Sequence, residues 1–377
     1  MQTMASLALD DARFMAAAIR LSQRHVGLTG TNPSVGALLV QGAGTPQARI
    51  VGRGVTAPGG RPHAEVVALA EAGPLAAGAT AYVTLEPCSH HGHTPPCSAA
   101  LVRAGVARVV AALRDPDPRV DGRGFAMLEA AGITIRTGVA AAEAAQPLAG
   151  FLARQRLGRP LLTVKLAHSA DGGIAAAGYV QAAITGAVAN AQTHLERARA
   201  DAILVGVGTV RSDDPALTCR LPGLEGRSPM RVVYDPALHM PQGARLVLTA
   251  RDVPTVIAVA QTLPQEATVP FERMGCRILR VPHGAGGPAG LLTALYALGV
   301  SSVLFEAGAR FGRTVLDAGL ADRIICVRGE RPLGEGRVAS PLAAAHLRQM
   351  RLCRDMILGA DRWQEYERTD PVCSPGS

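Results

Sequence analysis

Aromatic side chains and lysine are both scarce in this chain of 377 residues. Phe, Tyr and Trp make up 3% of it, with one Trp, and Lys165 is the only lysine among 38 basic residues. Base stacking needs aromatic platforms interleaved with basic residues, so this composition argues against a protein that binds RNA or single-stranded DNA. The net charge of +8 comes from arginines spread along the whole chain, which indicates compositional bias and not a binding patch.

Long hydrophobic runs are missing as well. No apolar stretch approaches the roughly 20 residues that cross a membrane, and the opening MQTMASLALDDARFMAAAIR lacks the basic start of a signal peptide. The seven cysteines are an odd number scattered over a long chain, which argues against a disulfide scaffold. Together these absences predict a protein of the reducing cytoplasm with no membrane partner.

Two α/β domains are expected from the length, at roughly 150 residues each. Helical and strand patterns alternate over residues 1–157, which predicts a sheet with helices on its faces. A stretch with Gly and Pro at 154–162 predicts a linker, and a second α/β series fills 158–377, whose last 15 residues or so are expected to fray. Helices are expected at 11–25, from 62, at 97–105 and at about 123–131, and strands at 35–40, 49–55, 80–87, 106–113, 133–139, 161–168, 201–208, 230–235, 255–260, 277–281, 302–308 and 323–327.

The stretch RPHAEVVALAEAG predicts a helix with Pro62 in its first turn, where the missing N–H has no partner in any case. That turn also carries His63 and Glu65. Downstream, Cys88 follows a predicted strand and Cys97 opens a predicted helix. Helix N-termini stabilise negative charge, which suits thiolates. One imidazole and two thiolates leave the fourth position of a zinc ion open for water, as in catalytic sites.

The pattern is close to the zinc-deaminase signature, H-x-E followed by P-C-x-x-C. The first half fits, but the second cysteine comes nine positions after Cys88 and not three. A lone H-x-E or a lone buried cysteine is common without any metal; the joint occurrence in this order predicts a zinc site. Zinc lowers the pKa of its bound water, and Glu65 is expected to pass that water's proton to the leaving ammonia. His90, His91 and His93 are alternative ligands, and we expect them to line the substrate mouth or to be solvated.

Several segments resemble the bifunctional riboflavin-biosynthesis deaminase/reductase family. The likeness covers nearly all of residues 11–157. It is carried by the segments TNPSVGALLV, PHAEVVAL, AYVTLEPCSHHGHTPPCSAAL, GVARVVAALRDPDPRVDGRG and GFLAR. The resemblance implies a cytidine-deaminase-like fold and hydrolytic deamination of 2,5-diamino-6-(5-phosphoribosylamino)pyrimidin-4-one. It assigns His63, Cys88 and Cys97 to zinc and Glu65 to proton transfer. It also places Asn32 against the pyrimidine, where the simpler interpretation is a turn-former before a strand.

Two strand–glycine junctions stand out in the second half. In VGVGTVRSDDPALTCR, Gly206 and Gly208 would let the backbone approach a phosphate. The segment lacks the G-x-G-x-x-G spacing and the later acidic residue of a dinucleotide-binding Rossmann unit. In FEAGARFGRTVLDAG, the helix that starts after Gly308 could hold a phosphate at its N-terminus. Glycine is also common at strand-to-helix turns that bind no ligand.

The second half resembles the reductase half of the same family in the segments KLAHSADG, ERARADAILVGVGTVRSDDPALTCR and FEAG. This resemblance implies a dihydrofolate-reductase-like fold and NADPH as the cofactor. The implied cofactor-binding residues are Ala167, Thr209, Asp213, Gly308, Ala309, Arg310, Phe311, Gly312, Arg313 and Thr314. The implied contacts to the ribosyl-phosphate substrate are Arg197, Leu217, Arg220 and Glu306. Two arginines suit bidentate phosphate recognition, although a solvated surface arginine is the plainer alternative. The sole lysine, Lys165, suggests a point charge in this site.

The reductase half departs from the family pattern at Gln181 and Ala183, where a serine and a tryptophan are expected, and at Ala170, where leucine is usual. A lost indole removes a large contact area, so a deaminase with a degenerate reductase half is the alternative function. An RNA-editing or RNA-binding protein built on a deaminase core is a third class, which would bind RNA with a steep salt dependence. We expect a cytoplasmic homo-oligomer that uses Zn²⁺ and NADPH.

Overall fold

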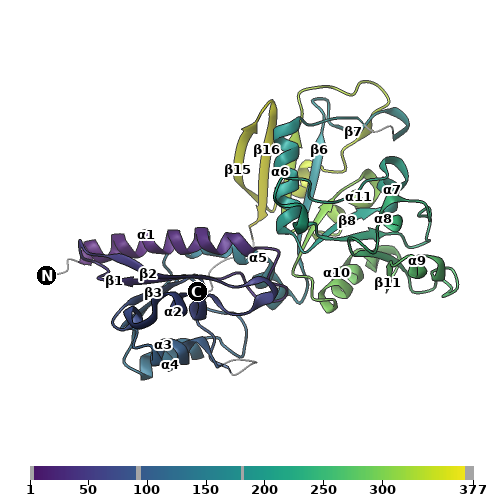
Figure 1. Cartoon of the computed structure of the whole chain (residues 1–377). Helices are drawn as coiled ribbons and strands as arrows, with labels where there is room; N and C mark the ends of the chain where they lie inside the picture. Colours follow the sequence, from purple (N-terminus) through teal and green to yellow (C-terminus); the bar gives the residue numbers. More distant parts are fainter. Residues whose placement is uncertain (1–3, 91–94, 180–181, 370–377) are drawn as a thin grey trace. The chain divides into compact units, whose positions relative to one another are not determined.

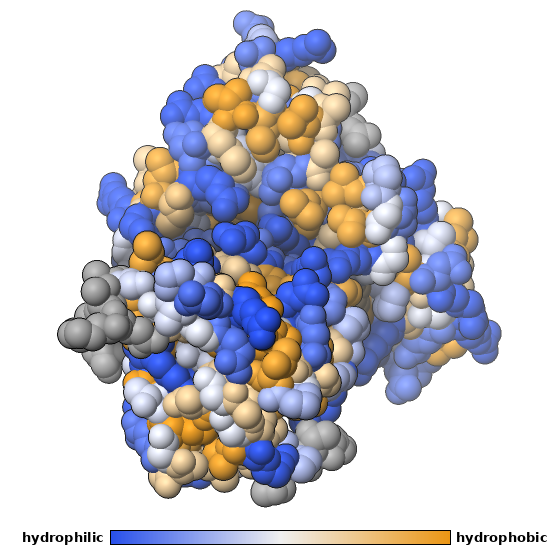
Figure 2. Space-filling view, turned by 60° about the vertical axis from the view of Figure 1, so that its left-hand side comes forward, coloured by the Kyte–Doolittle hydropathy of each residue, from blue (hydrophilic) through white to orange (hydrophobic). Residues whose placement is uncertain are grey.

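The computed structural model describes residues 4–90, 95–179 and 182–369 (Figure 1). Contacts divide the described chain into two compact units, one that ends at Leu157 and one that begins at Gly158. Among the described residues, no helix combines the length and the apolar character needed to span a bilayer. Figure 2 shows hydrophobic side chains in small groups between hydrophilic ones on the visible face.

A five-stranded sheet forms the centre of the N-terminal unit, in the order β2-β1-β3-β4-β5. Its strands are β1 (Gly36–Gln41), β2 (Arg49–Val55), β3 (Thr80–Val83), β4 (Arg108–Ala111) and β5 (Thr134–Thr137). β1 runs antiparallel to β2 and β3, whereas β3, β4 and β5 are parallel. The helices are α1 (Met4–Ser22), α2 (Ala64–Ala72), α3 (Cys97–Arg103), α4 (Arg123–Ala130) and α5 (Ala141–Leu157).

Helices cover both faces of this sheet: α1 lies on one side, and α2, α3 and α4 lie on the other (Figure 1). β1 is therefore buried along almost its whole length, and its sequence is a nearly continuous apolar run. Glycines in β2 let α2 approach closely, since a Cβ on Gly54 would lie 1.9 Å from the carbonyl oxygen of Ala64. This contact sets the first turn of α2, and with it His63 and Glu65, directly against the sheet.

A nine-stranded sheet forms the C-terminal unit, in the order β11-β10-β9-β8-β12-β6-β13-β16-β15. Its strands are β6 (Leu161–His168), β8 (Ala202–Gly206), β9 (Met230–Tyr234), β10 (Thr255–Ala260), β11 (Arg277–Val281), β12 (Ser302–Glu306), β13 (Arg323–Arg328), β15 (Met350–Leu358) and β16 (Asp361–Arg368). All are parallel from β11 to β13; β16 is antiparallel to both β13 and β15. A small second sheet pairs β7 (Gly173–Ala175) with β14 (Val338–Ala339).

Six helices accompany the described part of this unit: α6 (Ala187–Arg199), α7 (Val207–Asp213), α8 (Arg245–Leu248), α9 (Val269–Arg273), α10 (Gly287–Ala297) and α11 (Ala309–Asp317). α7 begins where β8 ends, and α11 begins two residues after β12 ends. β8 and β12 are neighbours in the sheet. Both strand–glycine junctions therefore open at one carboxyl edge, where α/β sheets bind ligands.

Three sequence expectations about boundaries are wrong. Pro62 precedes α2, which begins at Ala64 with His63 as its N-cap. Residues 154–157 belong to α5 and not to a linker, because alanines and leucines of this helix are buried in the core and hold it despite the internal Pro147. Part of the C-terminal stretch expected to fray is strand β16, which pairs on both sides and buries Trp363 completely. Residues 370–377 lie outside the described residues.

Candidate active sites

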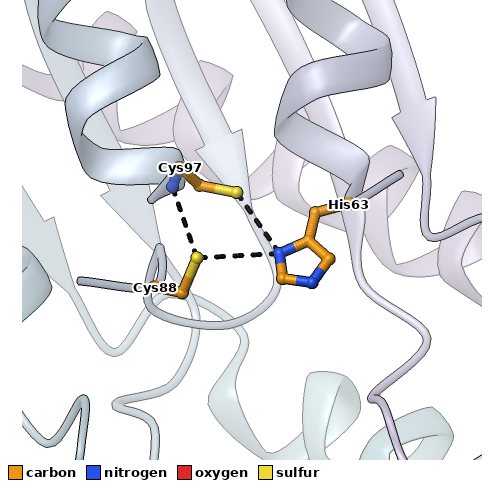
Figure 3. A group of neighbouring side chains, drawn as sticks. All are labelled: His63, Cys88 and Cys97. Carbon is orange, nitrogen blue, oxygen red and sulfur yellow. Dashed lines mark hydrogen bonds between the residues drawn. The ribbon is translucent and has the colours of Figure 1, made fainter. Parts of the chain in front are cut away.

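Three predicted metal ligands meet in the N-terminal unit (Figure 3). His63 caps α2, Cys97 is the first residue of α3, and Cys88 lies in the loop after β3. The Nδ1 atom of His63 is 3.4 Å from the Sγ of Cys97 and 3.6 Å from the Sγ of Cys88. The three ligand atoms all lie within 4.8 Å of one another. Two helix starts and one loop thus place an imidazole and two sulfurs around a common point.

This spacing fits zinc. Bonds of about 2.1 Å to nitrogen and about 2.3 Å to sulfur, meeting at a tetrahedral angle, put the two atoms about 3.6 Å apart. The observed distances from Nδ1 to the sulfurs are 3.4 and 3.6 Å. Three protein ligands of this kind leave the fourth tetrahedral position free for a water molecule.

The two sulfurs are not equivalent. Hydrogen bonding from Cys97 and from His63 outweighs burial and lowers the pKa of the Cys88 thiol to about 4. The same contact with Cys88, together with burial, raises the pKa of Cys97. The backbone N–H of Cys97 also donates to the Cys88 sulfur, at 3.3 Å. Both cysteines must be thiolates to bind a zinc ion, so metal binding would release protons from this pair.

Glu65 lies in the first turn of α2 and is only 5% exposed. Burial, reinforced by the charge of Cys88, raises the pKa of its carboxyl group to about 7. Its carboxylate also hydrogen-bonds with the Cys97 side chain. A carboxyl group with this pKa next to the metal ligands can accept and release a proton near neutral pH.

Among the described residues, neither the predicted pyrimidine contact Asn32 nor His90, one of the three histidines considered as alternative metal ligands, belongs to the cluster of predicted metal ligands. The side chain of Asn32 packs on Gly60, where a Cβ would lie 2.2 Å from its Nδ2 atom, so it borders the loop that leads into His63. The Nδ1 atom of His90 is buried and has no hydrogen-bond partner among the described residues. His91 and His93 lie outside the described residues.

Two buried acids near Cys88 were not singled out from the sequence. Glu86 is 3% exposed, and Asp115 is 6% exposed. Burial raises the pKa of Asp115 to about 7, and the charges of Asp117, Glu86 and Cys88 add to this effect. The sequence places Glu86 directly before Pro-Cys, which could have drawn attention to it. Its role was not predictable, because its hydrogen-bond donors lie about 30 to 40 residues further along the chain.

A second charged cluster lies in the C-terminal unit. Arg197, on α6, donates from Nε and Nη2 to the two carboxylate oxygens of Glu306, at 2.6 and 2.8 Å. Glu306 pairs with Lys165 across β12 and β6. Burial raises the pKa of Glu306, but Arg197 and Lys165 outweigh it and hold the value below the ordinary one. Burial lowers the pKa of Lys165.

The segment that follows α7 adjoins this cluster. Arg197 donates to the carbonyl oxygen of Thr218 at 3.0 Å, and the N–H of Arg220 donates to the Nδ1 of His194, on α6, at 3.3 Å. Leu217 is buried with a positive φ of 52°. The structure thus brings the predicted substrate residues Arg197, Leu217, Arg220 and Glu306 into one neighbourhood.

The two glycine junctions also meet. A Cβ on Gly308 would lie 3.2 Å from the Oγ1 of Thr209, and one on Gly206 would lie 3.2 Å from the side chain of Phe311. Both glycines thus let α7 and α11 pack closely at their N-terminal ends, where the backbone N–H groups of a helix can bind a phosphate.

The remaining predicted cofactor residues surround these junctions less closely. Ala167 is on β6, Asp213 ends α7, and Arg313 forms an ion pair with Asp317 at 3.7 Å. The remaining members of the predicted set on α11 are Ala309, Arg310, Gly312 and Thr314. Of the three departures from the family pattern, Ala183 is exposed, Ala170 is half-buried and Gln181 lies outside the described residues.

Both units match known families. Residues 9–113 match the cytidine and deoxycytidylate deaminase zinc-binding region, and residues 160–355 match the RibD C-terminal domain. The riboflavin biosynthesis protein RibD of Escherichia coli K12 is 40% identical over 338 residues, which are 86% of this chain and 89% of that protein. The Mycobacterium tuberculosis H37Rv protein of the same name is 42% identical over 318 residues, 84% of each chain.

Solved structures agree with this relationship. Acinetobacter baumannii RibD has a TM-score of 0.84 at 33% identity, over 96% of this chain and all of that one. A Thermotoga maritima diaminohydroxyphosphoribosylaminopyrimidine deaminase/5-amino-6-(5-phosphoribosylamino)uracil reductase has a TM-score of 0.83 at 28% identity, over 96% of this chain and 99% of that one. The predicted order of a cytidine-deaminase-like and a dihydrofolate-reductase-like domain is confirmed. The chain belongs to the bifunctional riboflavin-biosynthesis deaminase/reductase family and carries the deaminase and reductase steps of that pathway.

Proposed function

We propose that residues 1–157 form the deaminase domain, in which His63, Cys88 and Cys97 hold zinc and Glu65 transfers protons. The observation that carries this proposal is the meeting of one imidazole nitrogen and two sulfurs within 4.8 Å, beside a buried carboxylate. Zinc, when bound, supplies a water molecule of lowered pKa as the nucleophile. Glu65 accepts a proton from that water and delivers it to the departing amine.

The bonds of this step balance without a further reactant. The water oxygen forms a bond to the amine-bearing carbon of 2,5-diamino-6-(5-phosphoribosylamino)pyrimidin-4-one, and the carbon–nitrogen bond breaks. One proton of the water passes to the adjacent ring nitrogen and the other to the amine, which leaves as ammonia, so that the ring carbon becomes a carbonyl. Glu65 handles the proton in both directions, so its carboxyl group ends as it began, and Asn32 orients the pyrimidine.

We propose that residues 158–377 form the reductase domain, which converts the ribosyl chain of the deaminated product to a ribityl chain. NADPH, when bound, supplies the hydride. Arg197, Arg220, Leu217 and Glu306 position the ribosyl-phosphate substrate, and Lys165, the register partner of Glu306, contributes a point charge. The nucleotide is held by the backbone of residues 308–314 together with Ala167, Thr209 and Asp213. The absent side chain at Gly308, close to Thr209, supports this assignment.

Selective metal removal tests the two-site proposal on the full chain. A zinc chelator is expected to abolish ammonia release from the diamino substrate and to leave NADPH oxidation on the deaminated product unchanged. Adding Zn²⁺ back is expected to restore ammonia release. Ammonia release that survives complete removal of zinc would contradict the metal mechanism, and a lack of NADPH oxidation under every condition would contradict the reductase assignment.

We also propose a homo-oligomer in the cytoplasm. β15 is an edge strand of the described sheet and exposes Leu352 and Ile357, by 45% and 66%. Edge strands with exposed apolar side chains favour pairing with another chain. The odd number of cysteines, scattered along the chain, supports the cytoplasmic assignment. Sedimentation of the purified chain measures its mass directly, and a monomer at micromolar concentration would contradict the oligomer.

A further inference from the structure

Glu86 is a buried carboxylate two residues before the metal ligand Cys88, and the proposed chemistry does not use it. Its side chain is 3% exposed. Among the described residues, its carboxylate hydrogen bonds come only from backbone N–H groups. Such a carboxylate is costly to bury, so its position indicates a specific role.

Four N–H groups from a distant segment surround this carboxylate. Oε2 accepts from Asp115 at 3.3 Å and from Gly122 at 3.0 Å. Oε1 accepts from Gly124 at 2.9 Å and from Phe125 at 3.4 Å. Gly122 is the N-cap of α4, Gly124 and Phe125 lie in its first turn, and Asp115 lies in the loop between β4 and α4. A negative charge at a helix N-terminus is stabilised by the helix dipole and by charge-assisted hydrogen bonds.

The backbone next to Glu86 is held from the same side. Its own N–H donates to the carbonyl oxygen of Leu113 at 2.9 Å, which continues the pairing of β3 with β4. A Cβ on Gly124 would lie 2.0 Å from the carbonyl oxygen of Pro87, so α4 touches the residue that directly precedes Cys88.

α3 holds this loop from its own first turn. Ser98 donates to the carbonyl oxygen of Cys88 from both its backbone N–H, at 3.2 Å, and its hydroxyl, at 3.0 Å. The N–H of Cys97 donates to the Cys88 sulfur. Residues 86–88 are therefore clamped between the first turns of α4 and α3.

From this clamp we infer that Glu86 is a positioning residue of the metal centre. Its carboxylate ties the loop to α4 and so fixes the direction in which the Cys88 sulfur faces Nδ1 of His63. The inference rests on the proposed zinc site. A residue with a merely structural role would lower the free energy of unfolding when replaced, but it would leave the zinc affinity of the folded domain unchanged.

The test uses Glu86→Gln in the full chain. Glutamine keeps the size of the side chain but replaces one acceptor oxygen with an NH₂ group, which opposes two of the backbone donors. We expect zinc affinity, measured by chelator competition, to fall about 10- to 100-fold, the usual cost of losing a partner behind a metal ligand. We also expect a lower kcat for deamination with KM little changed, and altered thiolate–cobalt bands in the Co²⁺-substituted protein.

Asp11→Asn is the matched control, because Asp11 is another buried carboxylate of the same unit and binds Arg108. It is expected to lower the free energy of unfolding and to leave zinc affinity and the cobalt spectrum unchanged. Gly124→Ala is the second variant, because its Cβ would lie 2.0 Å from the carbonyl oxygen of Pro87 and 3.0 Å from Oε1 of Glu86, so that the carboxylate and the loop must both shift. We expect the same loss of affinity, and a less than additive loss in the double variant.

The outcomes separate this inference from the proposal on which it rests. Wild-type protein that binds no zinc would overturn the metal centre and the positioning role together. Wild-type protein that binds zinc, beside Glu86→Gln or Gly124→Ala variants that bind it equally tightly with the same cobalt spectrum, would overturn the positioning role alone.

Discussion

The guanidinium of Arg197 holds both carboxylate oxygens of Glu306 although the two residues are 109 positions apart in the chain. The pair is largely buried, with the side chains 11% and 19% exposed. Lys165 lies opposite Glu306 in the sheet, so one carboxylate faces two cationic side chains. The cluster therefore places two basic side chains near the glycine junction at Gly308, which suits the phosphate of the ribosyl substrate.

Glu306→Gln is expected to lower kcat/KM of the reductase about 10- to 100-fold. A hydrogen bond to a charged group contributes about 1.5–3 kcal/mol, and the change leaves Arg197 and Lys165 without their partner. NADPH oxidation on the deaminated substrate measures the loss. Ammonia release serves as the internal control and should be unaffected; an equal loss in both assays would point to misfolding and not to a local site.

Cys88→Ser and Cys97→Ser are each expected to remove most of the bound zinc and to abolish ammonia release, because a serine hydroxyl is a far poorer zinc ligand than a thiolate. Glu65→Gln should keep the zinc and still lose about 10²- to 10⁴-fold in turnover, since it deletes only the proton transfer. Metal analysis beside an ammonia assay separates the two classes. A Glu65→Gln variant with wild-type turnover would disprove the proton-transfer role.

Asp11→Asn is expected to destabilise the N-terminal unit by about 3–5 kcal/mol at pH 7, the cost of breaking a buried ion pair. Burial raises the pKa of Asp11, but hydrogen bonds and charges from Arg108, Tyr82 and Arg136 outweigh it and hold the pKa below its ordinary value. A depressed folded-state pKa stabilises the fold fully well above the unfolded pKa of about 3.9, and this contribution is lost progressively as the pH falls through that value and then through the lower folded-state pKa.

The variant should therefore show a flatter decline of stability between pH 5 and about pH 2 than the wild type. Urea unfolding followed by far-ultraviolet circular dichroism measures this decline. Trp363 is the only tryptophan and lies in the C-terminal unit, so its fluorescence is a built-in control. Parallel pH curves for variant and wild type would rule out the proposed linkage.

Ala183→Trp is expected to tighten NADPH binding about 2- to 10-fold, because an indole adds a large apolar contact and the position is exposed in this chain. Titration calorimetry with NADPH gives the dissociation constant. Leu9→Trp, at a site 72% exposed on α1 of the other unit, adds a tryptophan without touching the reductase and should have no effect. Unchanged binding by Ala183→Trp would show that this position does not contact the cofactor.

The candidate site was predictable where its residues carry a local pattern. His63 and Glu65 at the start of a helix, and cysteines after a strand and before a helix, indicate zinc chemistry by type, order and spacing. Most strands in both units were also predictable, since buried strands such as β1 and β10 read as apolar runs.

The C-terminal strands were missed because their pattern is dominated by charge. β15 and β16 carry arginines and acids that pair with one another across the strands, as Arg362 does with Asp355. The end of helix α5 was mistaken for a linker because Gly158 and Pro160 follow it directly. Pairing with β16 holds β15 although its side chains are mostly exposed, and burial of its apolar face holds α5 against the local propensity of Pro147.

By itself the sequence determined the chemistry available to this protein: the ligand types, the proton-carrying acid, the glycine junctions and the order of the two domains. Only the tertiary structure decided which distant groups act together. The four N–H groups around Glu86 and the Arg197–Glu306 pair join segments that are tens of residues apart. Such contacts leave no periodic trace in the chain, because they depend on where helices and strands end in space and not on the residues beside them.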